Sequence, residues 1–145
     1  MSCVLRARGA NFAVDEFLST STLKPIVVAR RGQPLYSKSR SRIPDASGFY
    51  AVASEADFSR LQVQIEEAVQ FLEHNQSELA RLVAFPGVDR VSLDFGIEER
   101  DVPAQKERFP PNLLRLAGDL GVWLEFTLYP QDQESNLSAD NEATG

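Results

Sequence analysis

Alternation of apolar and polar side chains with a period of two residues is the feature that most constrains how this chain can fold. Within residues 88–97 the two alternating sets are Val91, Leu93, Phe95 and Ile97 on one side and Ser92, Asp94 and Gly96 on the other. Because successive side chains of a strand point to opposite faces, this pattern predicts a strand with one buried and one open face. Residues 122–129 repeat the pattern, and the side chains predicted to face inward there are Val122, Leu124, Phe126 and Leu128. Such strands belong in a sheet that is covered on one side only.

Three other segments have the composition of strands. Residues 4–9 and 48–53 are short β-tolerant runs, and residues 25–30 are apolar and rich in β-branched side chains. A turn at 31–34 then precedes Leu35–Tyr36, which we interpret as a further short strand of edge character.

The longest helical pattern begins at Phe58. Apolar residues recur from there to Leu72 at intervals of three and four, which predicts an amphipathic helix. Ser54 and Asp57 stand just before the pattern with the spacing of a capping-box variant, so we expect them to cap the start of this helix.

The pattern continues to Ala84, but it predicts two helices rather than one. A single rod over residues 54–84 would be about 46 Å long, which is too long for a domain of this size. We therefore expect a break near His74, followed by a second helix with Asn75 as its N-cap that ends at Pro86–Gly87.

Two shorter helices complete the expected elements. Residues 14–18 have apolar side chains at helical spacing, and Pro110–Pro111 begins a helix that Gly121 caps. Residues 98–109, just before the second of these helices, are charged and irregular.

Strands and helices are mixed in this order without strict alternation. That order favours an α+β two-layer sandwich, with a mainly antiparallel sheet and helices packed on one face. Residues 1–130 are predicted to form a single domain. Residues 37–44 alternate serine with basic residues and predict a mobile basic loop, whereas residues 131–145, with four acids and no base, predict a disordered acidic tail.

A set of short segments forms a pattern over residues 3–129: Val4–Gly9, Val14–Leu18, Lys24–Pro25, Arg31–Gly32, Tyr50–Val52, the helix around Leu61 and Ile65, Leu116–Val122 and Leu124–Phe126. This pattern resembles a family of uncharacterised bacterial proteins, a domain of unknown function with an α+β sandwich fold. The resemblance implies that fold and a neighbourhood of the toxin–antidote kind. It carries over no catalytic residues.

Composition and motifs disfavour several classes of protein. One cysteine and one histidine leave no intrachain disulfide, no cysteine-rich zinc module and no second catalytic histidine. Glycine-rich phosphate-binding motifs are missing, which disfavours nucleotide enzymes, and we expect no cofactor and no metal ion. Arg6 and Arg8 interrupt the first apolar run, and no stretch nears the ~20 apolar residues that span a bilayer. We therefore expect a cytoplasmic protein of bacterial type without membrane association.

Charge is distributed unevenly along the chain. Eight basic and three acidic side chains give residues 1–50 a net charge of +5, whereas residues 51–145 carry −11. If the two parts stay apart in the fold, this dipole would steer a charged partner or pair two copies head to tail, so a homodimer is one possible assembly. If they fold together, their charges intermix on one surface.

The period-two pattern also selects candidate partner-binding residues. Arg6 and Arg8 share one side of the first strand, Asp94 lies on the polar side of a later strand, and Trp123 and Glu125 share one side of the last. If helices cover the leucine-rich side, all five line the open face. A tryptophan beside arginines and acids is the composition of protein-binding hot spots. We therefore predict a non-enzymatic protein-interaction module, immunity-like in kind, that binds a protein partner through this face.

The basic loop adds Arg31, Arg40 and Arg42 to the predicted partner-binding surface. It also supports an alternative, a weak nucleic-acid binder in which residues 30–42 grip phosphates and Tyr36 stacks on a base. A sequence pI near 4.8 disfavours that alternative, because the acidic remainder would repel a polyanion.

A second alternative is a small enzyme or ligand-binding domain. Asp94 and Glu125 could form a carboxylate pair for acid–base chemistry, which needs two acids in unlike environments. We favour instead a cross-strand grid in which Arg6 and Arg8 satisfy both acids and keep them ionised.

Overall fold

Five strands of the described chain form one mixed sheet. The computed structural model describes residues 1–36 and 42–131. Its strands are β1 (Cys3–Gly9), β2 (Pro25–Ala29), β3 (Ser47–Ser54), β4 (Arg90–Glu98) and β5 (Trp123–Tyr129), in the spatial order β2-β3-β1-β4-β5. β4 and β5 pair parallel and the other neighbours pair antiparallel, so the prediction of a mainly antiparallel sheet is confirmed.

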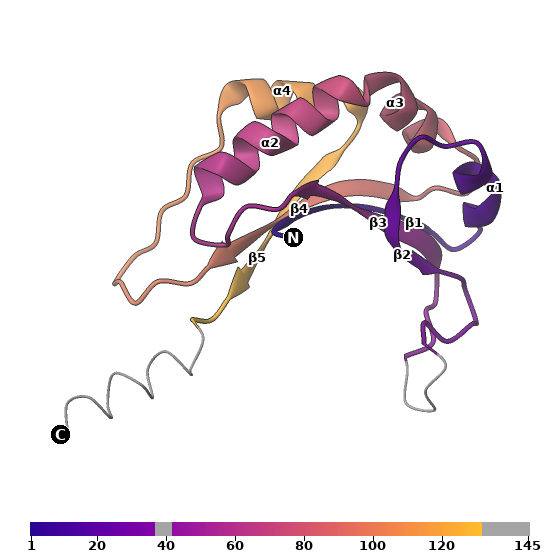
Figure 1. The fold of residues 1–145 in the computed structure, drawn as a ribbon, viewed down its shortest axis with the longest axis horizontal. Helices are drawn as coiled ribbons and strands as arrows, with labels where there is room; N and C mark the ends of the chain where they lie inside the picture. The colour runs from indigo at the N-terminus through magenta and orange to yellow at the C-terminus, as the bar shows by residue number, and fades with distance from the viewer. Residues whose placement is uncertain (37–41, 132–145) are drawn as a thin grey trace.

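Helices cover one side of this sheet. They are α1 (Val14–Ser19), α2 (Leu61–His74), α3 (Gln76–Ala84) and α4 (Pro111–Leu120). Figure 1 shows α2, α3 and α4 together above the sheet and α1 at one end of it. The other side of the sheet carries no helix within the described residues, and we call it the open face. The predicted α+β class is confirmed.

The covered face of the sheet carries the core. The alternating apolar side chains of β4 are all at most 2% exposed, as the period-two pattern predicts: Val91, Leu93, Phe95 and Ile97. The prediction that the other side of this strand is open is wrong, because Ser92 and Asp94 are only 3% and 7% exposed beneath the side chains of neighbouring strands. Leu72, Leu79 and Leu82 supply wholly buried side chains from the helices. Burial of these side chains removes apolar surface from water, which stabilises the fold by roughly 25 cal/mol for each Å² buried.

The break between the two long helices falls where the sequence predicts it. α2 ends at His74 and α3 begins at Gln76. Asn75 occupies the predicted N-cap position of α3, but its side chain makes no cap hydrogen bond there, and its side-chain amide donates instead to the carbonyl of Phe71 at 2.8 Å. Asn75 therefore satisfies the end of the first helix rather than the start of the second.

The start of α2 differs from its prediction. The helix begins at Leu61 and not at Phe58, and it has no side-chain cap. Ser54 is the last residue of β3, and its hydroxyl accepts a hydrogen bond from the amide of Ala56 at 3.1 Å. The carbonyl of Asp57 accepts from Arg60. The expected capping box is thus a turn between β3 and α2.

Phe58 lies outside the helix that its spacing predicts. Its ring packs against that of Tyr129 in a tilted arrangement with the centroids 4.8 Å apart, and it covers Gly96 of β4 so closely that a Cβ there would lie 2.3 Å from the ring. Only glycine leaves room for this ring. Apolar spacing alone did not distinguish a helical residue from one that folds around a neighbouring strand.

The prediction that β5 buries its even-numbered side chains is only partly correct. Val122, just before the strand, is buried and Leu124 is half-buried, but Phe126 and Leu128 are 60% and 51% exposed. β5 is an edge strand, so it has a neighbour on one side only. Its C-terminal half therefore lacks the cover that a central strand receives.

Three further predictions concern the segments around the β2–β3 connection and the C-terminus. Leu35–Tyr36 is not a strand, since both residues lie in bends of that connection. Most of the predicted basic loop, residues 37–41, and the predicted acidic tail, residues 132–145, lie outside the described residues.

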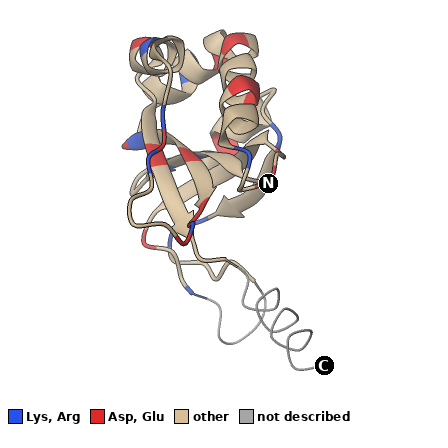
Figure 2. Ribbon diagram, turned by 90° about the vertical axis from the view of Figure 1, so that its left-hand side faces the viewer, with Lys and Arg blue, Asp and Glu red and all other residues tan. Residues whose placement is uncertain are grey.

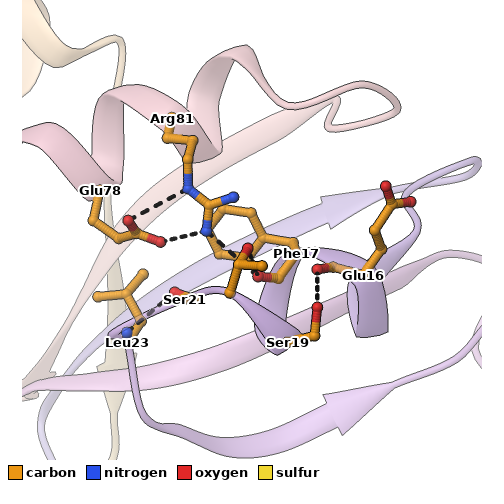
Figure 3. A network of polar contacts seen from close by, with 8 residues as sticks. Glu16, Phe17, Ser19, Ser21, Leu23, Glu78 and Arg81 are labelled. Atoms are coloured by element: carbon orange, nitrogen blue, oxygen red, sulfur yellow. Dashed lines mark hydrogen bonds and ion pairs between the residues drawn. The ribbon is translucent and has the colours of Figure 1, made fainter.

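A polar network fixes α3 against α1 (Figure 3). The guanidinium of Arg81 donates to Glu78 Oε1 at 2.6 Å and to the carbonyl of Phe17 at 3.4 Å, and it lies 4.2 Å from the centre of the Phe17 ring. Hydrogen bonding to Arg81 lowers the pKa of Glu78, and Ser21 contributes in the same direction. One arginine therefore joins two helices that are distant in sequence.

Candidate functional site

Strand pairing gathers the predicted polar residues on the open face. Arg6 lies between Tyr50 of β3 and Ser92 of β4, and Ser92 in turn lies beside Trp123 of β5. Paired residues of neighbouring strands point to the same face of a sheet. The side chains of these four residues therefore lie together on the open face.

A buried carboxylate anchors the middle of the open face. Asp94 is 7% exposed, and its Oδ2 lies 3.0 Å from Nη2 of Arg6. The hydroxyl of Thr127 donates to Asp94 Oδ1 at 2.8 Å. A cation and a hydroxyl thus compensate the burial of this charge, which would be costly without a partner.

Two arginines of the open face stack on aromatic rings. The guanidinium of Arg6 lies 4.7 Å from the centre of the Tyr50 ring, and that of Arg90 lies 4.2 Å from the centre of the Trp123 ring. Trp123 remains 57% exposed. These cation–π contacts hold long side chains in place at the surface before any ligand arrives.

The open face is hollowed beside the β2–β3 connection. The hollow has a volume of about 410 Å³, and we call it the arginine groove after its basic lining residues Arg6, Arg8, Arg42 and Arg90. Asp45 and Glu125 also line it. Arg8 Nη2 lies 3.5 Å from Asp45 Oδ1, and Arg90 Nη1 lies 4.0 Å from Glu125 Oε1.

This geometry tests the arrangement predicted for the two acids. Asp94 and Glu125 are neighbours in the register of β4 and β5, but each lies against its own arginine. Each carboxylate therefore has a basic partner of its own, as the predicted cross-strand grid requires. The predicted grid of Arg6 and Arg8 with the two acids forms only in part, because Glu125 lies against Arg90 and Arg8 lies against Asp45.

The predicted site residues differ in where they lie relative to the arginine groove. Arg6, Arg8, Arg42 and Glu125 line the arginine groove, while Asp94 lies behind Arg6 and Trp123 stacks on Arg90 at its side. Arg31 is not among the lining residues, since its guanidinium donates to the carbonyl of Ala10 at 3.3 Å and its amide donates to Ser47. Arg40 lies outside the described residues.

Sequence reasoning missed Arg90 and Tyr50. Both could have been found from the same alternation, because Arg90 shares its parity with Ser92 and Asp94 and the register places Tyr50 beside Arg6. Arg90 was missed because it is the first residue of β4 and stands just before the alternating residues that identify the strand.

His74 Nδ1 donates to the carbonyl of Gln70 in its own helix, at 2.7 Å. Within the described ranges no three His, Cys, Asp or Glu side chains gather as metal ligands. None of the helices described combines the length and the apolarity needed to cross a bilayer.

Comparisons with protein-family models, with curated proteins and with solved structures found no match to this chain. The function of the open face therefore has to be argued from its own geometry and chemistry.

Proposed function

We propose that this chain is a protein-binding module, cytoplasmic and immunity-like in role, that binds its partner through the open face of the sheet. The two arginine–aromatic stacks, Arg6 on Tyr50 and Arg90 on Trp123, are the observation that carries this proposal. Arginine, tyrosine and tryptophan are the side chains that contribute most binding energy at protein interfaces. Because the stacks exist before binding, a partner loses less free energy to ordering these side chains.

The charges of the groove indicate the chemistry of the partner. Four lining arginines face the carboxylates of Asp45 and Glu125, with Asp94 behind them. A surface segment that presents carboxylates to the groove and an apolar side chain to Trp123 would complement it. This pattern favours an acidic protein partner.

Truncation of the exposed indole provides the test. After capture and purification of a bound protein, its affinity for Trp123→Ala and Arg90→Ala is measured by isothermal titration calorimetry. We expect each variant to weaken binding about tenfold or more, since a hot-spot truncation costs at least about 1.4 kcal/mol.

Leu114→Ala is the matched control for these variants. Leu114 lies on α4, on the covered side of the sheet, and is 51% exposed, close to the exposure of Trp123. We expect this control to bind like the unmodified chain. Unchanged affinity in all three variants would overturn the proposal that the open face binds the partner.

A small anionic ligand is the second candidate occupant. The groove volume of about 410 Å³ lies within the range of small-molecule sites, and guanidinium groups bind carboxylates and phosphates through charge-assisted hydrogen bonds. In such a ligand site Glu125 lines the groove and Asp94 positions Arg6. The two acids do not act as an acid–base pair in this candidate. The nucleic-acid alternative has less support, because a chain with a net charge of −6 repels a long polyanion as a whole.

Thermal unfolding separates this candidate from the first. With inorganic phosphate or citrate at about 10 mM, a bound anion raises Tm of the unmodified chain, and Arg8→Ala abolishes the rise. If neither anion shifts Tm, the small-ligand candidate is excluded while the protein-binding proposal is unaffected.

A further inference from the structure

The outer edge of β5 offers backbone groups for pairing. The amide of Glu99 donates to the carbonyl of Tyr129 at 2.8 Å, so the odd-numbered residues of β5 direct their backbone groups toward β4. By alternation, the N–H and C=O groups of Leu124, Phe126 and Leu128 point away from β4. No strand of the described chain lies on that side.

The two edges of the sheet are built differently. β2 has five residues, begins with Pro25, and shifts register between Pro25 and Val27, all of which hinder pairing with another strand. β5 has seven residues without proline, glycine or a basic side chain, and its register with β4 is regular throughout. Natural edge strands usually carry such protection, so its absence from β5 points to a pairing role.

Both faces of β5 carry exposed apolar side chains beside this edge. Phe126 and Leu128, on the covered side of the sheet, are 60% and 51% exposed, and Trp123 and Tyr129, on the open face, are 57% and 40% exposed. Phe126 and Leu128 also line a hollow of about 340 Å³ together with Val102, and its remaining lining includes the charged residues Glu99, Arg100 and Glu107. An added strand would cover part of this surface on both faces at once.

We propose that two copies of this chain associate by antiparallel pairing of β5 with β5 about a two-fold axis at Phe126. This symmetric register places Trp123 opposite Tyr129, Leu124 opposite Leu128, and Glu125 opposite Thr127 of the second copy. Aromatic residues meet aromatic residues, leucine meets leucine, and the single charge of the strand faces the small side chain of Thr127, whose hydroxyl donates to Asp94. The two sheets become one continuous sheet.

Self-complementarity is the reason for choosing a second copy as the occupant. A two-fold interface uses the same patch twice, so each residue must tolerate its symmetry mate's position, and every pair in this register does. The two Glu125 carboxylates are only diagonal neighbours, and each has Arg90 within 4.0 Å. Three hydrogen-bonded pairs would exchange about six backbone hydrogen bonds. The inference does not rest on the proposed function.

A disulfide at the two-fold axis tests the register. In the unmodified chain Cys3 is wholly buried, and burial raises the pKa of its thiol, so it does not compete. The two Cα atoms of a hydrogen-bonded pair lie about 5.5 Å apart, within disulfide range, so Phe126→Cys is expected to form a covalent dimer under mild oxidation. In Leu128→Cys, the matched control, the two cysteines would lie about 13 Å apart along the strands and remain unlinked. Equal cross-linking of both variants would overturn the proposed register.

Sedimentation of the reduced protein tests association itself. We expect the unmodified chain to form dimers at about 100 μM, and Phe126→Lys to be monomeric at that concentration because it places two like charges at the axis. Leu114→Lys makes the same change at an exposed site on α4 and should remain dimeric. A monomeric unmodified chain, including one whose β5 is instead occupied by a different protein, would refute the proposal.

Discussion

At the scale of single residues, Arg81 shows how one side chain serves several neighbours. It pairs with Glu78, donates to the backbone of Phe17, and covers the Phe17 ring (Figure 3). Its side chain is 36% exposed, so the charge stays partly hydrated and its burial costs little. Packing and pairing therefore act together at the contact between α1 and α3.

The lowered pKa of Glu78 gives this contact a dependence on pH. A carboxyl whose pKa is lower in the folded than in the unfolded state stabilises the fold above its unfolded value, about 4.3, and loses that effect as the pH falls through the folded value. Denaturant unfolding across pH 7 to 2 should show Glu78→Gln less stable than the unmodified chain at pH 7, with the difference vanishing toward pH 2.

The double mutant cycle with Arg81 checks the cause of this dependence. In an Arg81→Met background, Glu78→Gln should have little effect on the free energy of unfolding at any pH, since hydrogen bonding to Arg81 is the main cause of the shift. A pH-dependent difference that persists in that background would assign the effect to another neighbour.

At the scale of elements, two glycines of one helix end have opposite requirements. Gly118 lies inside α4, and a Cβ there would meet no atom within 4 Å, whereas Gly121 forms the left-handed C-cap with φ of 76°. Gly118→Ala should raise the free energy of unfolding by roughly 0.5–1 kcal/mol, and Gly121→Ala should lower it by about 1 kcal/mol or more. Urea unfolding measures both, and a stabilising Gly121→Ala would contradict the role assigned to the cap.

The helix and strand segments were largely predictable because their causes are local. Alternation predicts β4, and Gly121 predicts the end of α4, since both depend on neighbours in sequence. The start of α2 and the exposure of Phe126 were not predictable in this way. The start of α2 depends on the packing of the Phe58 ring across β4, and the exposure of Phe126 depends on how far the helices extend over the sheet. The spacing of apolar residues in the sequence gives no information about either.

At the scale of the whole molecule, the charge asymmetry of the sequence does not survive folding as two separate poles. Arg6 from the basic part pairs with Asp94 from the acidic part, and Figure 2 shows acidic and basic residues both among the helices and along the sheet. Strand order explains this result, because β1 lies between β3 and β4. Net charges of sequence segments therefore predict little about faces.

The candidate site was only partly predictable from the sequence, because strand alternation is local whereas the path of a connection is not. Strand parity placed Arg6, Asp94 and Trp123 on one face from sequence alone, which the register confirms. The groove beside them depends on the path of the β2–β3 connection and brings in Asp45 and Arg42 from that connection. Such long-range placement is set by tertiary packing.

A sheet that is covered on one side divides each strand between two tasks. In β1, Leu5 and Ala7 are buried in the core, while the side chain of Arg6 between them is 37% exposed on the opposite face. Substitutions at every second position can then alter what the molecule recognises without reopening the interior. New binding specificity can therefore evolve through single substitutions on one face while the core and the fold stay the same.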